Sequence, residues 1–446
     1  MGFTTDSRSS VGCEPDAGRE TSVDGVIDAG RGGPRRRGWP SRRLTGLWRQ
    51  SDFRRFWAAQ AVSAVGSQVT LLALPLIAAL TLKASPFQVG VLAATETAPF
   101  LLVGLFAGVW VDRRRRRPIL IAADLARAAL LATIPLASVM GVLGMGMLYA
   151  VALLTGTLTL FFDVAFLSYL PALVGRDGLI EGNSKLQVSA STAQVAGPGL
   201  AGWLIGLAGA PFAVAIDAVS FLVSGLLVTR IGTPEPAPKT VADEQHVWRE
   251  IGEGLRTVRR DATLRALAAC SATTSVFAWV FFAVYVLYMT RNLGLTPGAI
   301  GLVFATGGVG ALAGALVAGP AARRFGQGRA IVWGQLLFGL FGLVVPLAVL
   351  VPAIALPMVV ASEFLQWMAV VVYDVNALSL RQARTPDRLQ GRVNATMRFL
   401  VWGLRPVGSL LGGYLGGAIG LPWTLVVGEL GMLLAVGWLV GSPMRE

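Results

Sequence analysis

The sequence predicts an all-α membrane protein with twelve transmembrane helices in two six-helix pseudo-repeats, and three observations lead to this fold class. Of the 446 residues, 54% are hydrophobic and only 14% are charged, which is too apolar for a soluble protein of this size. Twelve apolar runs are long enough to cross a bilayer. Basic residues gather in every second connection between these runs, a pattern typical of multi-pass membrane proteins.

Each predicted crossing contains the roughly 20 apolar residues that a helix needs to span the hydrocarbon core. In chain order the crossings are 56–80, 87–111, 118–140, 146–170, 186–207, 210–230, 264–290, 297–320, 329–350, 353–378, 395–419 and 422–441. Because their number is even, both termini are expected on the same side of the membrane.

The distribution of positive charge predicts the orientation of these crossings. Basic clusters occupy alternate connections, at 113–117, 176–185, 230–265, 323–329 and 381–392. Lys83 and Arg291 are the only basic residues in the remaining connections. We therefore expect both termini to be cytoplasmic. Arginine outnumbers lysine 35 to 3, which is typical of a GC-rich bacterial genome, so the predicted location is a bacterial plasma membrane.

Two polar segments divide the chain. Residues 1–50 are rich in Gly, Ser, Asp and Arg and lack apolar periodicity, which predicts a disordered basic cytoplasmic arm. Residues 231–262 begin with three prolines and continue with a basic stretch, for which we predict a cytoplasmic linker containing an amphipathic surface helix. The two predicted six-helix bundles are therefore 51–230 and 263–446.

The two bundles repeat one another at a constant spacing of 211 residues. The recurring patterns are Ser85-Pro86 with Thr296-Pro297, Gly108 with Gly319, Phe162-Asp163-Val164 with Tyr373-Asp374-Val375, and Pro211 with Pro422. Four matches at one offset indicate a duplication. Repeats that run in the same direction hold a substrate at their interface, near the middle of the membrane.

The connection after the second predicted crossing has a pattern that goes beyond orientation. Gly108 precedes Asp112 by four residues, and five arginines follow, Arg113 to Arg117. Five cations cross a bilayer only at great cost, so the loop is expected on the cytoplasmic side. Gly104 and Gly108 share a helix face with Asp112, so we expect a neighbouring backbone to approach them closely and the loop to act as a hinge. A simple orientation signal is the alternative.

The segment from Gly108 to Arg117, Gly-Val-Trp-Val-Asp-Arg-Arg-Arg-Arg-Arg, resembles the signature loop of the major facilitator superfamily of secondary transporters. That loop usually reads Gly-x-x-x-Asp-Arg-x-Gly-Arg-Arg, and Arg115 stands here in place of its inner glycine. The next segment, Ile121 to Ala128, is similar to the corresponding segment in the branch of drug, macrolide and siderophore exporters.

The resemblance implies a gating loop formed by Gly108, Asp112, Arg113, Arg116 and Asp163. In the superfamily the loop's acid interacts with the positive end of the eleventh helix, which assigns that role to Asp112. An arginine of the motif pairs with an acid of the fourth helix, which here implies a pair between Arg116 and Asp163.

The fifth predicted crossing contains a proline flanked by glycines, Gly197, Pro198 and Gly202. Proline frees a carbonyl and bends a membrane helix, and glycines let another helix pack against the bend. The segment resembles a shortened form of the Gly-Pro motif of exporters. A purely structural kink is the alternative.

Ionisable residues inside the apolar runs are the sharpest evidence for function. A charge at the bilayer centre costs about 2.5–3.5 kcal/mol on the insertion scale, so it normally faces a cavity or a partner. These residues are Glu96, Asp217, Glu363, Arg398, Arg405 and Glu429. Glu96 and Glu363 lie nearest the middle of their crossings and are our first candidates for proton coupling or for binding a cationic substrate. Asp217 and Arg398 are further candidates, although Asp217, like Glu429, lies in a peripheral helix and can serve as a structural partner instead.

Several polar and aromatic side chains are candidates for lining a central cavity suited to bulky amphipathic compounds. They are Gln60, Ser63, Gln68, Thr70, Asn376, Trp279, Phe282, Tyr285 and Tyr288. Ordinary packing is the alternative for the aromatic residues, and an interfacial belt is a second alternative for Tyr285 and Tyr288.

Other functional classes have little support in the sequence. There is no Gly-x-x-x-x-Gly-Lys-Ser/Thr loop for a nucleotide, and Cys13, Cys270 and His246 do not have the spacing of a metal site. We expect no enzyme, no cofactor and no nucleic-acid partner, because the arginines lie in a tail and in short loops.

The predicted function is proton-driven efflux of an amphipathic small molecule by alternating access. The expected partners of a monomeric protein of this kind are its substrate and membrane lipid. A proton-coupled nutrient importer and a receptor or scaffold that does not transport are the alternatives.

Overall fold

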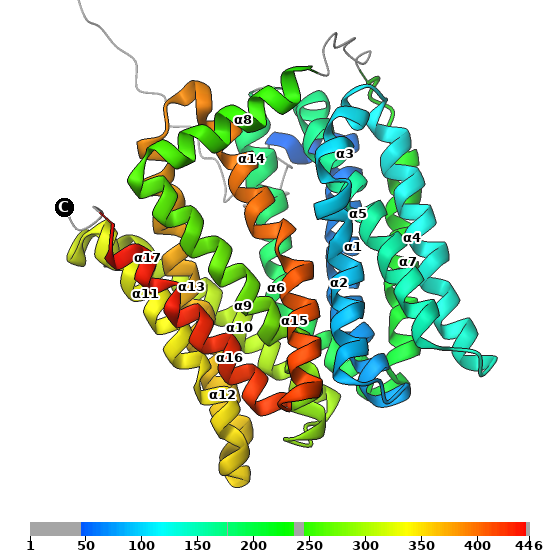
Figure 1. Cartoon of the computed structure of the whole chain (residues 1–446). Helices are drawn as coiled ribbons and strands as arrows, with labels where there is room; N and C mark the ends of the chain where they lie inside the picture. The colour runs from blue at the N-terminus through cyan, green and yellow to red at the C-terminus, as the bar shows by residue number, and fades with distance from the viewer. Residues whose placement is uncertain (1–45, 176, 236–244, 443–446) are drawn as a thin grey trace, which may run out of the picture. The chain divides into compact units, whose positions relative to one another are not determined.

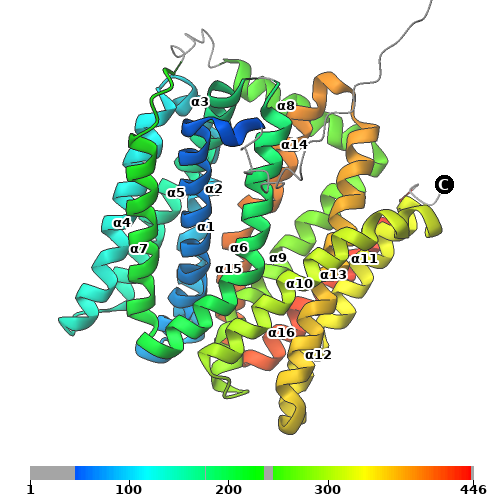
Figure 2. The ribbon, with the colours of Figure 1, turned by 180° about the vertical axis from the view of Figure 1, so that it is seen from behind.

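A computed structural model describes residues 46–175, 177–235 and 245–442. The predicted arm therefore lies almost wholly outside the described residues, as does the middle of the predicted linker. The described secondary structure is helical (Figures 1 and 2).

The first half contains a short 3-10 helix η1 and seven α-helices. Their bounds are η1 Gly46–Arg49, α1 Ser51–Leu76, continued by a π-helical turn η2 Ile77–Thr81, α2 Pro86–Leu102, α3 Gly104–Asp112, α4 Arg116–Val139, α5 Met145–Val174, α6 Leu179–Ala208 and α7 Ala210–Thr229.

The second half begins with the linker helix α8. The bounds are α8 Gln245–Arg260, α9 Ala262–Arg291, α10 Pro297–Phe325, α11 Gln327–Gly342, α12 Val344–Leu347, η3 Ala348–Leu350, η4 Pro352–Ile354, α13 Ala355–Arg384, α14 Asp387–Gly403, α15 Arg405–Ala418, α16 Leu421–Leu434 and α17 Val436–Val440.

The predicted fold class is confirmed: the chain is an all-helical membrane protein, and its helical segments correspond to the twelve predicted crossings. Nine segments of the described chain are individually long and apolar enough to span a membrane. The other three are α6, α2 with α3, and α14 with α15. The last two pairs are each interrupted by a single residue, Val103 and Leu404.

The observed helices extend beyond the predicted apolar runs mainly at one end of the bundle. Helix α6 starts at Leu179 rather than 186, α13 continues to Arg384 rather than 378, and α14 starts at Asp387 rather than 395. All three extensions are polar and lie at the end that carries the arginines 113–117, which we call the arginine-loop end. Hydropathy detects the part of a helix that lies in hydrocarbon, whereas the helix itself continues into the aqueous surface.

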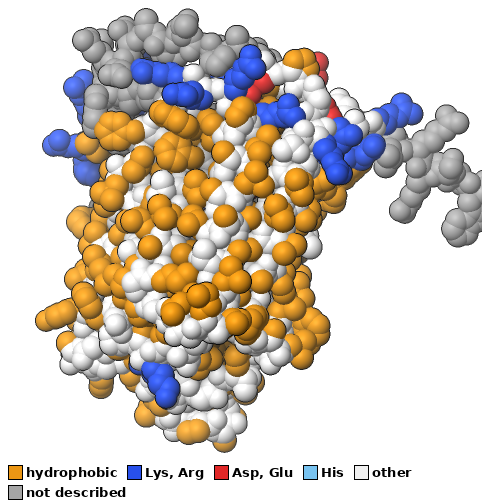
Figure 3. All heavy atoms as spheres, turned by 90° about the vertical axis from the view of Figure 1, so that its right-hand side faces the viewer, with side chains coloured by type: hydrophobic (Ala, Val, Ile, Leu, Met, Phe, Trp, Pro, Cys, Tyr) orange, Lys and Arg blue, Asp and Glu red, His pale blue; other side chains and the backbone are white. Residues whose placement is uncertain are grey.

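Surface charge and apolar surface are separated in the same way. In Figure 3 a broad belt of hydrophobic side chains covers the face in view, and most Lys and Arg side chains gather at one end of it. This distribution is that of a protein surrounded by lipid, with its basic loops in water.

The start of the described chain corrects one predicted boundary. Residues 46–50 were assigned to the arm, but Gly46–Arg49 form η1, which packs against the following bundle. Leu47 is only 4% exposed, and its backbone N–H donates to Glu181 Oε1 at 3.2 Å. The apolar Leu47 and Trp48 anchor this segment, and a composition average over residues 1–50 hides them.

Helix α8 confirms the predicted helix in the linker. It lies on α14 and α9, and Glu253 forms an ion pair with Arg392. Val258 of α8 belongs to a buried cluster with Val393 and Met397 of α14. The linker is therefore attached to the second half through α14.

The two halves meet along two pairs of helices, α2 with α15 and α6 with α10. Glycines make the closest contacts, because a Cβ on Gly90 would lie 2.6 Å from the Cα of Gly413 and a Cβ on Gly202 would lie 2.8 Å from the Cα of Gly301. All four glycines lie toward the end opposite the arginine loop. At that end the backbone of α2 contacts that of α15, and the backbone of α6 contacts that of α10.

The glycine contact between α2 and α15 gives a test. We expect Gly90→Ala to lower the thermal unfolding midpoint of the purified protein, because the added methyl overpacks the helix pair at a cost of about 1–3 kcal/mol. The matched control is Gly104→Ala, since a Cβ there meets no atom within 4 Å. Equal effects of the two substitutions would show that the contact is not tight.

Candidate functional site

The arginine loop joins α3 to α4, and its glycines do not behave as predicted. Among the described residues, a Cβ on Gly104 or Gly108 would meet nothing within 4 Å, so no described backbone makes the close approach that we expected there. Regular spacing along a helix shows which residues share a face, but it does not show whether another helix covers that face.

The predicted partner of Arg116 also needs correction, because the structure pairs Arg116 with a residue of the linker. Its Nη1 lies 3.6 Å from Glu235 Oε1. Glu235 also accepts from the backbone N–H groups of Arg116, at 2.6 Å, and Arg117, at 3.2 Å. A carboxylate in this position satisfies free N–H groups at the start of α4 and interacts favourably with the helix dipole.

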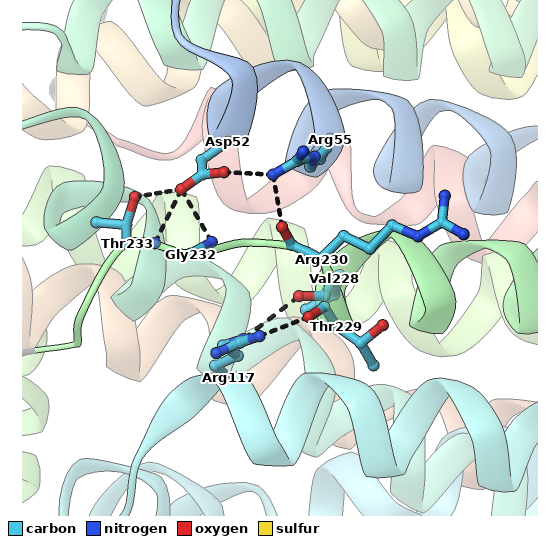
Figure 4. A network of polar contacts seen from close by, with 8 residues as sticks. All are labelled: Asp52, Arg55, Arg117, Val228, Thr229, Arg230, Gly232 and Thr233. Carbon is cyan, nitrogen blue, oxygen red and sulfur yellow. Dashed lines mark hydrogen bonds and ion pairs between the residues drawn. The ribbon is translucent and has the colours of Figure 1, made fainter.

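A network of polar contacts fixes the segment that carries Glu235 (Figure 4). Asp52 accepts from Gly232 N at 3.0 Å, and from Thr233 N at 2.8 Å and Thr233 Oγ1 at 2.7 Å. Arginines bind the last carbonyls of α7: Arg55 donates to Arg230 O at 2.6 Å, and Arg117 donates to Val228 O at 3.3 Å and Thr229 O at 2.6 Å. We call these residues, together with Glu235, the linker clamp. Nothing in the local sequence pattern predicts it, because its members come from three distant segments.

Asp163 lies in the middle of other charges. Arg127 of α4 and Arg398 of α14 act on it electrostatically. Arg127 itself pairs with Asp124 at 2.5 Å. Both side chains of this pair are buried.

The Asp124–Arg127 pair is the charged centre of the first bundle. Ser224 Oγ donates to Asp124 Oδ2 at 2.6 Å, and the Arg127 guanidinium lies 4.3 Å and 4.1 Å from the ring centres of Phe162 and Phe221. Charge, hydrogen bonds and aromatic faces thus compensate for the loss of water around both groups.

Asp217 is buried between α7 and α1. It accepts from Thr70 Oγ1 at 2.5 Å and from Ser220 Oγ at 2.9 Å. Gly66 of α1 makes room for it, because a Cβ there would lie 2.5 Å from Asp217 Oδ1. These contacts stay within the first bundle, which fits the structural alternative for Asp217.

Glu363 lies inside the second bundle and is only 2% exposed. Its carboxylate accepts from Tyr285 Oη at 2.9 Å and from Trp367 Nε1 at 2.8 Å. Tyr285 and Tyr288 are fully buried, so the interfacial belt considered for them is wrong. Glu363 faces protein rather than acyl chains.

Glu429 is buried nearby, on α16. Both of its carboxylate oxygens lack a hydrogen-bond partner among the described residues, and Glu363 acts on it electrostatically. Gly342 provides the space, since a Cβ there would lie 2.0 Å from Glu429 Oε1. The pairing that we considered for Glu429 is therefore not made by hydrogen bonds within the described structure.

Glu96 is the acid at the interface between the two halves. It lies on α2, and the charge of Arg405, at the start of α15, acts on it. The neighbouring contacts also cross this interface: the ring centres of Phe100 and Trp402 are 4.8 Å apart. Arg398 lies 5.3 Å and Arg405 lies 4.0 Å from the Trp402 ring centre, so the ring that contacts Phe100 of α2 also lies beside two arginines of the second half.

The glycines beside Pro198 on α6 are in close contact with other helices. A Cβ on Gly197 would lie 2.5 Å from Gln68 Cγ of α1, and a Cβ on Gly202 would lie 2.6 Å from Pro297 O of α10. Helix α6 continues through Pro198 without a break. The segment therefore packs on both halves.

The candidate residues thus fall into three sites rather than one. Glu96 and Arg398 lie at the interface, Glu363 lies inside the second bundle, and Asp217 lies inside the first. Arg405 and Glu235 are the residues that sequence reasoning undervalued. Arg405 had a signal, as a cation inside an apolar run. Among the described residues, no cluster of three or more His, Cys, Asp or Glu has the geometry to hold a metal ion.

Two bundles of membrane helices that meet along two helix pairs, with charges between them and a basic loop after the second crossing, define a secondary transporter of the major facilitator type rather than an enzyme. The chain belongs to the family of transmembrane secretion effectors, whose profile matches residues 45–446.

Three curated relatives are similar along most of their length. The multidrug efflux pump Tap of Mycolicibacterium fortuitum is 28% identical, over 84% of this chain and 92% of the relative. Macrolide efflux protein A of Streptococcus pyogenes is 24% identical, over 86% and 94%. The enterobactin exporter EntS of Escherichia coli is 25% identical, over 84% and 86%.

Solved structures share the fold at low sequence identity. A bacterial homologue of the iron transporter ferroportin in an inward-facing state matches with a TM-score of 0.70 and 17% identity, over 89% of this chain and 99% of that one. A structure of a bacterial ferroportin homologue in an outward-facing state matches with a TM-score of 0.58 and 18% identity, over 87% and 98%.

The buried pair in the first bundle gives a stability test. We expect Asp124→Ala to destabilise the protein by about 3–5 kcal/mol, because Arg127 would keep its buried charge and lose its ion-pair partner. Thermal unfolding of the purified protein measures the effect. The control is Asp177→Ala, at an exposed position. An unchanged midpoint for Asp124→Ala would show that another acid replaces Asp124.

The linker clamp gives a second test. Asp52→Ala removes the acceptor of two backbone N–H groups, so we expect faster amide hydrogen exchange at Gly232 and Thr233. Peptide-level exchange measured by mass spectrometry reports this region. Asp387→Ala, at the exposed start of α14, serves as control. Equal rates of amide hydrogen exchange at residues 228–235 in the two variants would show that the linker clamp does not hold this segment.

Proposed function

We propose that this protein exports an amphipathic small molecule across a bacterial cytoplasmic membrane by alternating access, driven by protons. The observation that carries the proposal is the position of Glu96 and Arg405 between two bundles whose backbones touch at one end. Bundles that meet around a charged centre can expose it first to one side of the membrane and then to the other.

The direction of the described state follows from the positive-inside rule. If the arginine-loop end is cytoplasmic, as its basic residues indicate, the glycine contacts between Gly90 and Gly413 and between Gly202 and Gly301 close the outer end. The described conformation is then inward-facing. The higher TM-score with the inward-facing ferroportin homologue supports this assignment.

Proton coupling is assigned to the two acids nearest the middle of the membrane. Glu96 lies where the halves separate, and Glu363 accepts two hydrogen bonds inside the half that contains Arg405. Each proton that returns to the cytoplasm supplies about 2.3 kcal/mol per 100 mV of membrane potential. That energy is sufficient for modest accumulation of substrate outside the cell.

Gating is assigned to the arginine loop and its neighbours, Gly108, Asp112, Arg113 and Arg116. In this state Arg116 is bound to Glu235, so closing the cytoplasmic end has to rearrange or carry along the linker clamp. The three named relatives are all exporters or efflux proteins, which supports export rather than uptake.

Transport in everted membrane vesicles tests the proposal. With an imposed pH gradient, vesicles containing the protein are expected to accumulate a fluorescent amphipathic dye, and Glu96→Gln is expected to abolish this accumulation because the residue can no longer exchange a proton. Asp177→Asn, at an exposed position, is the matched control.

Dye that the protein moves out of the everted vesicles, instead of into them, would indicate uptake by the cell rather than export. Dye movement that persists without a pH gradient, or that Glu96→Gln leaves intact, would contradict coupling through Glu96. If neither Glu96→Gln nor Glu363→Gln has an effect and no substrate moves, a receptor or scaffold becomes the better description.

A further inference from the structure

Arg405 is a cation held between the two halves without an acceptor for its Nε atom among the described residues. The positive charge of Arg398 on α14 and the carboxylate of Glu96 on α2 both act on it electrostatically. Within the described chain, however, no nitrogen of Arg405 lies within 4.0 Å of a carboxylate oxygen of Glu96, so the two groups do not form an ion pair. The guanidinium therefore retains hydrogen-bonding capacity that the protein does not use.

Two tryptophans fix the position of this guanidinium. Its central carbon lies 4.0 Å from the ring centre of Trp402 and 5.2 Å from that of Trp279. Arginine stacks on aromatic rings through its planar group while the donors at its edge stay available. Trp402 is in turn held against Phe100 of α2, so both halves contribute to the setting.

The backbone around Arg405 is equally well anchored. Ser275 Oγ of α9 donates to Val401 O at 2.5 Å. A Cβ on Gly408 would lie 2.3 Å from Val276 O. Because α9 holds the chain on both sides of Arg405, the direction of its side chain is set by the packing of α9 against α14 and α15.

Arg405 also lies deep in the membrane. It is thirteen residues from the end of α15 at Ala418, and Glu96 is ten residues from the start of α2 at Pro86. At 1.5 Å per residue these intervals correspond to about 20 Å and 15 Å, near the middle of a hydrocarbon core about 30 Å thick. A cation at this depth is a site for a substrate or a partner by default.

We propose that Arg405 binds an anionic group of the transported molecule, a carboxylate, sulfonate or phenolate, and that Trp279, Trp402 and Phe100 contact the aromatic or apolar body attached to it. The planar fork of arginine matches such oxyanions with two parallel hydrogen bonds. This inference rests on the proposed function, and it names the substrate class for the same interface.

Glu96 then competes with the ligand. In the empty site its negative charge offsets part of the positive charge of Arg405, on which Arg398 also acts, and a bound anion has to share that positive charge with Glu96. Removing the charge of Glu96 strengthens anion binding, whereas a site built for cations would lose affinity by the same change. Glu96 therefore distinguishes the two polarities of ligand.

Calorimetric binding to the full chain in phosphatidylcholine nanodiscs tests the inference with three probes of one shape: 2-naphthoate, 2-naphthamide and 2-naphthylmethylammonium. We expect naphthoate to bind at least tenfold more tightly than the other two. Arg405→Gln removes this preference, Arg405→Lys retains part of it, and Glu96→Gln increases naphthoate affinity severalfold. Arg259→Gln, at an exposed position on α8, leaves all three affinities unchanged.

Equal affinities for the three probes in the unmodified protein would overturn the inference. A preference for the ammonium probe that Glu96→Gln abolishes would also overturn it, in favour of a cationic substrate. If Arg405→Gln fails to fold, Arg405→Lys and Glu96→Gln decide. Binding is measured without transport, so the two proposals can fail separately. If naphthoate binds through Arg405 but the protein moves no dye, the proposed export is refuted and this inference stands. If the protein exports dye but does not prefer naphthoate, this inference is refuted and the proposed export stands.

Discussion

A charge buried in this protein can be stabilised only by groups of the protein itself, because the surrounding hydrocarbon offers none. Asp124 with Arg127 meets this requirement through an ion pair and two aromatic faces, and Glu363 meets it through a tyrosine and a tryptophan. Each of these groups lies in the same bundle as its own partners. They can therefore move with that bundle as a body and keep their hydrogen bonds. Glu96 and Arg405 differ, because they lie on opposite sides of the interface between the bundles and act on each other without forming an ion pair among the described residues.

The contacts that join the halves are compatible with the alternating access that we propose. At the end opposite the arginine loop, the closest approaches are between glycine backbones, Gly90 with Gly413 and Gly202 with Gly301. Such contacts are made by dispersion forces, and separating them leaves no buried polar group without a partner. The bond from Arg291 Nη2 to Ala84 O, at 2.6 Å, is a polar link across this end. It lies at a loop, where water can replace it.

The fold could be predicted from the sequence because hydrocarbon imposes a single pattern, long apolar runs separated by charged loops. The Asp124–Arg127 pair is also within reach of sequence reasoning, since both residues lie on one helix three positions apart. Such reasoning missed Glu235 as the partner of Arg116, because that contact joins segments more than a hundred residues apart. It also predicted a close approach of a neighbouring backbone to Gly104 and Gly108 that the described residues do not make, since spacing identifies a helix face but not whether another helix covers it. Arg405 was visible as a charge in an apolar run, but its tryptophan neighbours required coordinates.

The described ends of the linker are attached to different bundles. At its first end the clamp binds Glu235 to the start of α4, directly after the arginine loop. At its second end α8 is fixed to α14 by the Glu253–Arg392 pair, and α14 leads into Arg405. The relative movement of the bundles that we propose would therefore change the distance between the two anchors. Since α14 and α4 each adjoin a site to which we assign a role in transport, a change in the linker is expected to alter gating even though it touches no substrate.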